Sequence, residues 1–121
     1  HIVRAALEGI GFTVTDVLKV MESEAGIPLM QLCADGGAVR NRFLMQFVAD
    51  INHRDLLVSL LPELSALGAV FSGGLVTGVY RNTDDVQAIN SGVIEYHPQL
   101  AIDSVEKLYA GWNQAIKKVL L

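Results

Sequence analysis

Residues 29–50 have the sequence LMQLCADGGAVRNRFLMQFVAD, which contains a short apolar run, a glycine pair and an amphipathic segment in immediate succession. The run from Leu29 to Ala34 is mostly apolar and has the length of a strand. Asp35, Gly36 and Gly37 have the composition of a tight turn. The residues after the turn recur at helical spacing, namely Val39, Phe43, Leu44, Phe47 and Val48. The segment therefore predicts a strand, a turn and a helix that begins near Ala38.

The predicted turn lies at the carboxyl end of a strand, where α/β sheets open a crevice toward the first N–H groups of a helix. Because Gly36 and Gly37 have no Cβ, a ligand can approach their backbone closely. If the helix begins near Ala38, Asn41 lies in its first turn, where its amide can meet a purine edge or a ribose hydroxyl. A glycine pair also suits any tight reversal, and a solvated Asn is common in a first turn. These residues alone predict either a nucleotide-binding turn or a purely structural one.

The pattern DGGAVxNxFLMQFxAD over residues 35–50 resembles the adenosine-binding segment of the FGGY carbohydrate kinases, closest to their glycerol kinase branch. Motifs on both sides resemble the same family: RAxLEGIxF at 4–12, GIPL at 26–29, ALGA at 66–69 and YxxWxxA at 109–115. The resemblance covers nearly the whole chain, but only the last quarter or so of such a kinase. It implies an α/β fold, part of an actin-like ATPase (ribonuclease H-like) domain, with helices packed on a small sheet.

The resemblance also implies a function for residues 1–121, as a single domain that forms the C-terminal portion of the second FGGY kinase domain. Such enzymes transfer a phosphoryl group from Mg-ATP to a polyol hydroxyl, and glycerol is the acceptor that we expect. Gly36, Gly37 and Ala38 would present their backbone to the adenosine and its nearest phosphate, and Asn41 would touch the base. The catalytic Asp, the Mg²⁺ ligands and the sugar-binding residues of the family lie upstream of His1. We therefore assign no catalytic or metal-binding residue to this chain, and we expect Asp35 to cap or orient the turn.

Two departures from the family pattern keep alternatives open. Glycerol kinases usually carry Arg-Pro where this chain has Val58 and Ser59, and Gln and Arg are often found near Thr13 and Thr15. The acceptor is therefore either glycerol or another sugar, such as a pentulose. The alternative from another functional class is a non-catalytic interaction module that reuses the actin-like fold, with a purely structural glycine pair.

Composition limits the remaining possibilities. A chain of 121 residues with 51% hydrophobic content is long enough for one domain with a core. Its mean hydropathy of +0.39 predicts apolar surface that something else covers, and the uncapped helical rhythm from Ile2 predicts a fragment of a larger enzyme. A net charge of −4 argues against a nucleic-acid partner. The single Cys33 and three dispersed histidines predict neither a disulfide framework nor a metal site.

The rest of the chain predicts further helices and strands. We expect a helix over 2–25 that Gly26 and Pro28 end, a loop at 51–55, a strand at 56–58 and a helix start at Pro62 and Glu63. Later elements are a short helix over 84–89 capped by Thr83, an extended segment at 93–97 and a closing helix from Ile102 in which Trp112 is a core anchor.

The segment from Leu64 to Tyr80 has no charged residue over 17 positions, which is close to the length of a membrane span. Four glycines interrupt it, and small side chains share one helical face, as close packing against a neighbouring element requires. We therefore predict a helix inside a soluble core and no membrane partner. With no targeting segment in view, we expect a cytoplasmic enzyme, and we expect it to be a homo-oligomer.

Overall fold

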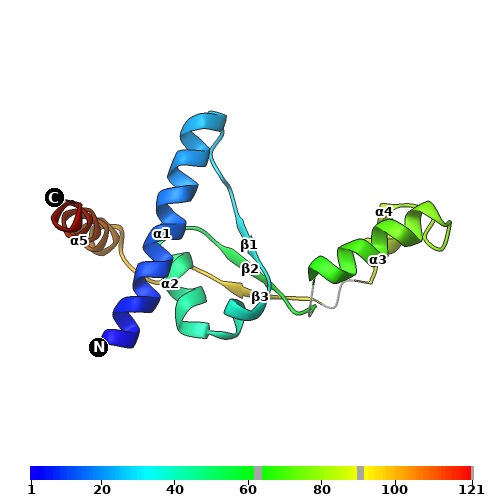
Figure 1. Ribbon diagram of the computed structural model, residues 1–121, viewed down its shortest axis with the longest axis horizontal. Coiled ribbons are helices and arrows are strands. Elements are labelled where there is room, and N and C mark those ends of the chain that lie inside the picture. Colours follow the sequence, from blue (N-terminus) through cyan, green and yellow to red (C-terminus); the bar gives the residue numbers. More distant parts are fainter. Residues whose placement is uncertain (62–63, 90–91, 121) are drawn as a thin grey trace.

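The computed structural model describes residues 1–61, 64–89 and 92–120, and its centre is a small mixed sheet with strand order β1-β2-β3. Strand β1 pairs in parallel with β2, and β2 pairs antiparallel with β3. Figure 1 shows α1 and α2 beside the sheet, α3 and α4 beyond one end of the strands, and α5 on the far side of α1. The elements are α1 (Ile2–Ala25), β1 (Leu32–Ala34), η1 (Gly37–Arg40), α2 (Arg42–Asn52), β2 (Leu56–Ser59), α3 (Leu64–Val76), α4 (Thr83–Gln87), β3 (Val93–Tyr96) and α5 (Ile102–Val119).

The core lies between one face of the sheet and helices α1 and α2. Residues alternate along a strand, so Leu32 faces this core while the next residue, Cys33, is exposed on the other face. Strand β2 alternates in the same way, with Leu56 and Val58 almost fully buried. The buried residues that pack together here are Leu32, Leu44, Met45, Val48, Ala49, Leu56 and Val58. This arrangement confirms the prediction of helices packed on a small sheet.

Helix α1 has the predicted bounds because Gly26 ends it in the left-handed conformation, with φ of 65°. Beyond this cap the chain is fixed by Glu22, whose carboxylate accepts hydrogen bonds from the Leu29 N–H and from the Arg54 guanidinium, both at 2.7 Å. The hydrogen bond from Leu29, helped by the nearby Arg54 charge, lowers the pKa of Glu22. These contacts attach the end of α1 to the loop that precedes β2.

Helix α5 packs against α1 through a carboxylate with two aromatic partners. Asp16 accepts hydrogen bonds from the Tyr109 hydroxyl and, at 2.8 Å, from the Trp112 indole N–H. The Trp112 ring stacks on Phe12 with a centroid distance of 5.2 Å, and the Lys19 ammonium lies 3.4 Å from the centroid of the Tyr109 ring. Trp112 is partly buried against Phe12, Phe47 and Ile51, so its predicted role as a core anchor is confirmed.

Three predicted boundaries are wrong. Strand β1 has three residues instead of six, because it pairs only with the part of β2 that begins at Leu56. Helix α2 continues two residues into the predicted loop, to Asn52, since Ile51 is still buried in the core, and His53 ends it with a left-handed φ of 49°. The short helix α4 is capped by Asn82, whose Oδ1 accepts from two backbone N–H groups, and not by Thr83.

The prediction that the small-residue helix lies inside the core is also wrong. None of the described residues of α3 is buried, and Val76 is 89% exposed. The apolar contacts of α3 are local, because Tyr80 folds back onto Gly74 and its ring meets Phe71 edge-on at 5.9 Å between centroids. Among the described residues no helix is long and apolar enough to span a membrane. The helix start predicted at Pro62 and Glu63 lies outside the described residues.

The close contact of α1 with α2 at Gly11 generates a stability prediction. A Cβ at Gly11 would lie 2.5 Å from Cδ1 of Phe47, which is itself only 5% exposed. We expect Gly11→Ala to lower the free energy of unfolding by about 1–3 kcal/mol, the usual cost of overpacking a core. Gly9→Ala is the matched control, because nothing lies within 4 Å of its Cβ position on the same helix. Thermal denaturation of both variants checks this, and equal effects would contradict the contact.

An ion pair between His97 and Asp55, at the end of the sheet away from α3 and α4, generates a pH prediction. The Nδ1 atom of His97 lies 2.8 Å from Oδ1 of Asp55, and this hydrogen bond to a carboxylate raises the pKa of His97. A histidine whose pKa is higher in the folded than in the unfolded protein stabilises the fold fully at pH values below its unfolded pKa of about 6.5. This stabilisation is lost as the pH rises through its folded pKa. We therefore expect His97→Gln to lower the melting temperature at about pH 6 and to have less effect at about pH 8.5. A pH-independent difference from wild type would contradict the ion pair.

Candidate functional site

The candidate site lies at the edge of the sheet where two parallel strands end. Because β1 and β2 are parallel, the residues that follow them, Gly36 and Gly37 on one strand and Leu60 and Leu61 on the other, meet at the same edge. In Figure 1 helices α3 and α4 lie beyond this edge. The parallel pairing thus brings together two segments that are more than twenty residues apart in the sequence.

A cavity of about 270 Å³, here called the glycine cavity, opens between the turn and the end of β2. Its lining is mixed, and the lining residues with polar side chains are Arg40 and Ser59. The lining residues are Gly36, Gly37, Val39, Arg40, Val58, Ser59, Leu60, Leu61 and Ile94. The predicted glycine pair therefore faces a cavity, and side chains of the described residues do not fill it.

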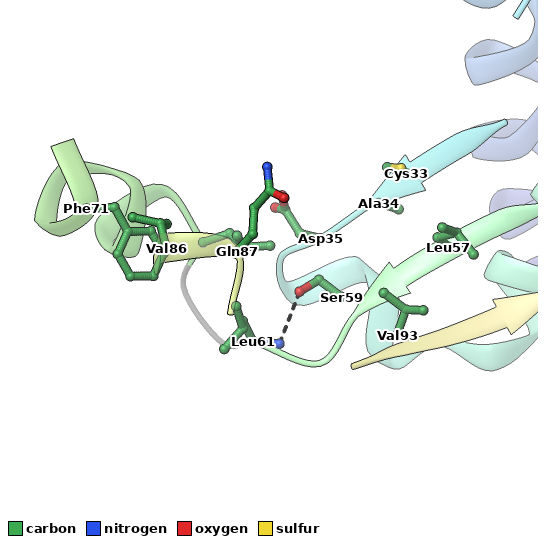
Figure 2. Close-up of a pocket in the computed structure, with 11 residues that line it drawn as sticks. Cys33, Ala34, Asp35, Leu57, Ser59, Leu61, Phe71, Val86, Gln87 and Val93 are labelled. Carbon is green, nitrogen blue, oxygen red and sulfur yellow. Dashed lines mark hydrogen bonds between the residues drawn. The ribbon is translucent and has the colours of Figure 1, made fainter. Parts of the chain in front are cut away.

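A second cavity of about 500 Å³, here called the apolar cavity, adjoins the first, because Ser59 and Leu61 line both. Figure 2 shows that it lies between the ends of the strands and the α3–α4 segment. Cys33 and Leu57 line it from the sheet, and Phe71 and Val86 line it from the α3–α4 segment. Its polar side chains include Asp35, Gln87 and Ser59. Ser59 is held in place because its Oγ accepts a hydrogen bond of 3.1 Å from the Leu61 N–H (Figure 2).

The two glycines of the turn differ in whether the fold requires them. Gly36 has φ of 87° and ψ of −170°, a conformation that is almost restricted to glycine. Gly37 is not among the described residues with positive φ, and a Cβ built on it would have no atom of these residues within 4 Å. Neither backbone conformation nor packing within the described part of the chain requires glycine at position 37. A bare backbone there leaves space beside the glycine cavity for a group that is not part of this chain.

Asn41 has a structural role that the sequence did not predict. The turn continues as the 3₁₀-helix η1, so α2 begins at Arg42 and Asn41 is its N-cap, outside the first turn in which we expected it. Its Oδ1 accepts a hydrogen bond of 3.0 Å from the Leu44 N–H. Within the part of the chain that the structure describes, its Nδ2 group has no hydrogen-bond partner. The side chain therefore retains two donors for an external ligand.

Asp35 does not cap the turn as we expected. The N-cap of η1 is Gly36 without a side-chain hydrogen bond, and the carboxylate of Asp35 makes no hydrogen bond or ion pair with any described residue. It lines the apolar cavity instead. No group of three His, Cys, Asp or Glu side chains among the described residues has a geometry that fits a metal ion.

The structure thus places the predicted site residues in different ways. Gly36 and Gly37 line the glycine cavity, whereas Ala38 is exposed beside them and Asn41 is half-buried at the start of α2. Arg40, Leu61 and Ser59 are lining residues that the sequence analysis did not select. Ser59 had one signal, its departure from the family pattern, but only the strand pairing shows that it faces the glycine turn.

The sequence of the chain is similar to sequences of known carbohydrate kinases. Residues 1–76 match the model of the FGGY family of carbohydrate kinases, C-terminal domain. Over 98% of its length the chain is 41% identical to a glycerol kinase of Shewanella frigidimarina, and over 99% it is 44% identical to one of Stenotrophomonas maltophilia. It spans 24% of the length of each of these relatives.

Two solved structures have the same fold. A glycerol kinase of Plasmodium falciparum with ADP superimposes with a TM-score of 0.88 and 32% identity, over the whole chain and 24% of that protein. A xylulose kinase of Rhodospirillum rubrum superimposes with a TM-score of 0.77 over 96% of the chain and 24% of that protein, at 23% identity. The α/β fold expected from the resemblance, with helices on a small sheet as in these kinases, is therefore confirmed.

The different needs of the two glycines generate a prediction. We expect Gly36→Ala to lower the free energy of unfolding by about 1–3 kcal/mol, because alanine is strained at its φ and ψ. We expect Gly37→Ala to leave that free energy unchanged or to raise it by up to about 1 kcal/mol, because its backbone is unstrained and its Cβ has room. Thermal denaturation of the two variants makes the comparison. A similar loss for both would mean that Gly37 is needed by the fold itself.

Proposed function

The chain belongs to the FGGY family of carbohydrate kinases, and we propose that it supplies the adenosine-binding segment of an ATP-dependent kinase. The longer protein would transfer the γ-phosphoryl group of Mg-ATP to a polyol hydroxyl, with glycerol as the acceptor. Phosphoryl transfer of this kind requires accurate positioning and stabilisation of charge. Residues of this chain would contribute to the first by holding the nucleotide, while the catalytic base and the Mg²⁺ ligands would lie outside it.

One observation carries the proposal, the bare backbone of Gly37 beside the glycine cavity. A nucleotide that lies along this edge would contact the backbone of Gly36, Gly37 and Ala38, and there is space at the two glycines, where even an added Cβ would have no described atom within 4 Å. The free Nδ2 group of Asn41 would donate to the base from the adjacent helix start. That the Plasmodium falciparum relative has a structure with ADP supports ATP and ADP as the ligands.

Glycerol is the preferred acceptor because the relatives at 41% and 44% identity are glycerol kinases. The likeness to xylulose kinase, at 23% identity, supports the fold alone. We place the full-length enzyme in the cytoplasm as a homo-oligomer. These two assignments and the choice of glycerol over another sugar remain predictions from the sequence.

Calorimetric titration of the full-length protein with ATP tests the proposal against the non-catalytic module. A kinase should show saturable heat of binding, and a module with a purely structural glycine pair should show none. A phosphorylation assay with glycerol and with a pentulose then separates the two acceptors. Absence of both ATP binding and turnover would overturn the proposed function.

The double role of Asn41 gives the corresponding mutational prediction. In Asn41→Ser the hydroxyl still accepts the Leu44 N–H, so the cap is retained while the Nδ2 donors are lost. We expect the ATP dissociation constant to rise about two- to tenfold, the cost of one net hydrogen bond, with KM for the acceptor and the melting temperature unchanged. Asn41→Ala should raise the dissociation constant equally and also lower stability by about 1 kcal/mol through loss of the cap. An unchanged ATP affinity in Asn41→Ser would remove Asn41 from the site.

A further inference from the structure

Arg40 is one of the residues that line the glycine cavity, and its exposed side chain has no counter-charge among the described residues. Arg40 is the last residue of η1, and no described carboxylate lies within ion-pair distance of it. Arg4 and Arg54 do have such partners, since Arg4 pairs with Glu8 at 2.8 Å and Arg54 with Glu22 at 2.7 Å, whereas Arg42 and Arg81, like Arg40, have none among the described residues. A guanidinium stays charged over the whole physiological pH range, so one residue that lines this cavity has a permanent positive charge.

The second polar side chain of the glycine cavity is also a donor. The Oγ atom of Ser59 accepts the N–H of Leu61, so its own hydrogen is free to point to a ligand. No Asp or Glu is among the described residues that line this cavity, and the carboxylate of Asp35 lies in the wall of the adjoining apolar cavity. The glycine cavity therefore offers a fixed charge, a hydroxyl donor and a bare backbone, a combination that fits an anionic group.

We propose that Arg40, assisted by Ser59, binds a phosphate of the nucleotide at this site and so determines its specificity for phosphorylated adenosine. This inference rests on the proposed function, because the glycine backbone beside Arg40 is the surface to which that function assigns the nucleotide. The guanidinium donates to phosphate oxygens through two parallel N–H groups, and the Ser59 hydroxyl donates a further hydrogen bond. Val58, Leu60 and Ile94 supply the apolar part of the same wall.

A guanidinium can instead stack on a purine ring, and the two arrangements predict different ligand dependence. Contact with phosphate strengthens the binding of ADP and ATP and leaves adenosine unaffected. Stacking on the base strengthens the binding of all three. Adenosine is therefore the ligand that separates the two arrangements.

The test is calorimetric titration of the full-length protein and its Arg40→Gln variant with ATP, ADP and adenosine. Glutamine keeps part of the length and polarity of the side chain and removes its charge. We expect the dissociation constants of ATP and ADP to rise about tenfold, as for loss of a charge-assisted hydrogen bond, and that of adenosine to be unchanged. Arg42→Gln is the matched control, because Arg42 is exposed on the adjacent turn and lines neither the glycine cavity nor the apolar cavity.

Each alternative result has a defined meaning. If wild type binds ATP and Arg40→Gln binds it equally well, the role of Arg40 is wrong and the proposed function stands. If adenosine loses affinity as much as ADP, Arg40 contacts the base or supports the turn, and the phosphate assignment is overturned. If wild type binds none of the three ligands, the proposed function fails and this inference fails with it. An unchanged melting temperature of Arg40→Gln confirms that the comparison is between folded proteins.

Discussion

The parallel pairing of β1 with β2 is the constraint that creates the candidate site. Parallel neighbours require a crossover, and here η1 and α2 form it, packed on the same sheet face as α1. The crossover must leave β1 at the edge where β2 also ends. Gly36 makes that exit possible with a backbone conformation that other residues adopt only under strain. The backbone turn at Gly36 that lets the chain cross over to β2 therefore also forms one wall of the glycine cavity.

Helix α2 connects this edge with the opposite side of the domain. Its start is fixed by Asn41. Its middle and its last turn hold the segment before α5, because Gln46 donates to the His97 carbonyl at 2.8 Å and buried Asp50 accepts the Gln99 N–H at 2.6 Å. The same helix contributes Phe47 to the contact with Gly11 of α1. A helix held at so many points positions the turn before it accurately, as a binding backbone requires.

The sequence was sufficient where a local signal determined the structure. Gly26 predicted the end of α1, and the glycine pair predicted the turn, since glycine has conformational freedom that no other residue has. Sequence reasoning failed where partners lie far apart in the chain. The length of β1 depends on where β2 begins, and the position of Arg40 and Ser59 in one cavity depends on how two strand ends come together. Asn41 was selected for its amide, but its capping role required knowledge of where the 3₁₀ turn ends and the helix begins.

Helix α3 is an uncharged helix that borders the apolar cavity. Its residues carry no charge on any side, and such a helix is normally covered by other polypeptide. In the described residues it is exposed, as is Cys33 on the outer face of the sheet, a face that parallel strands usually bury as well. The chain spans about a quarter of the length of the relatives it matches, so most of such a protein lies outside it. Both uncovered surfaces border the apolar cavity, through Phe71 on α3 and Cys33 on β1. The surfaces of this chain that stay exposed and the cavity beside the glycine turn are therefore parts of one continuous region.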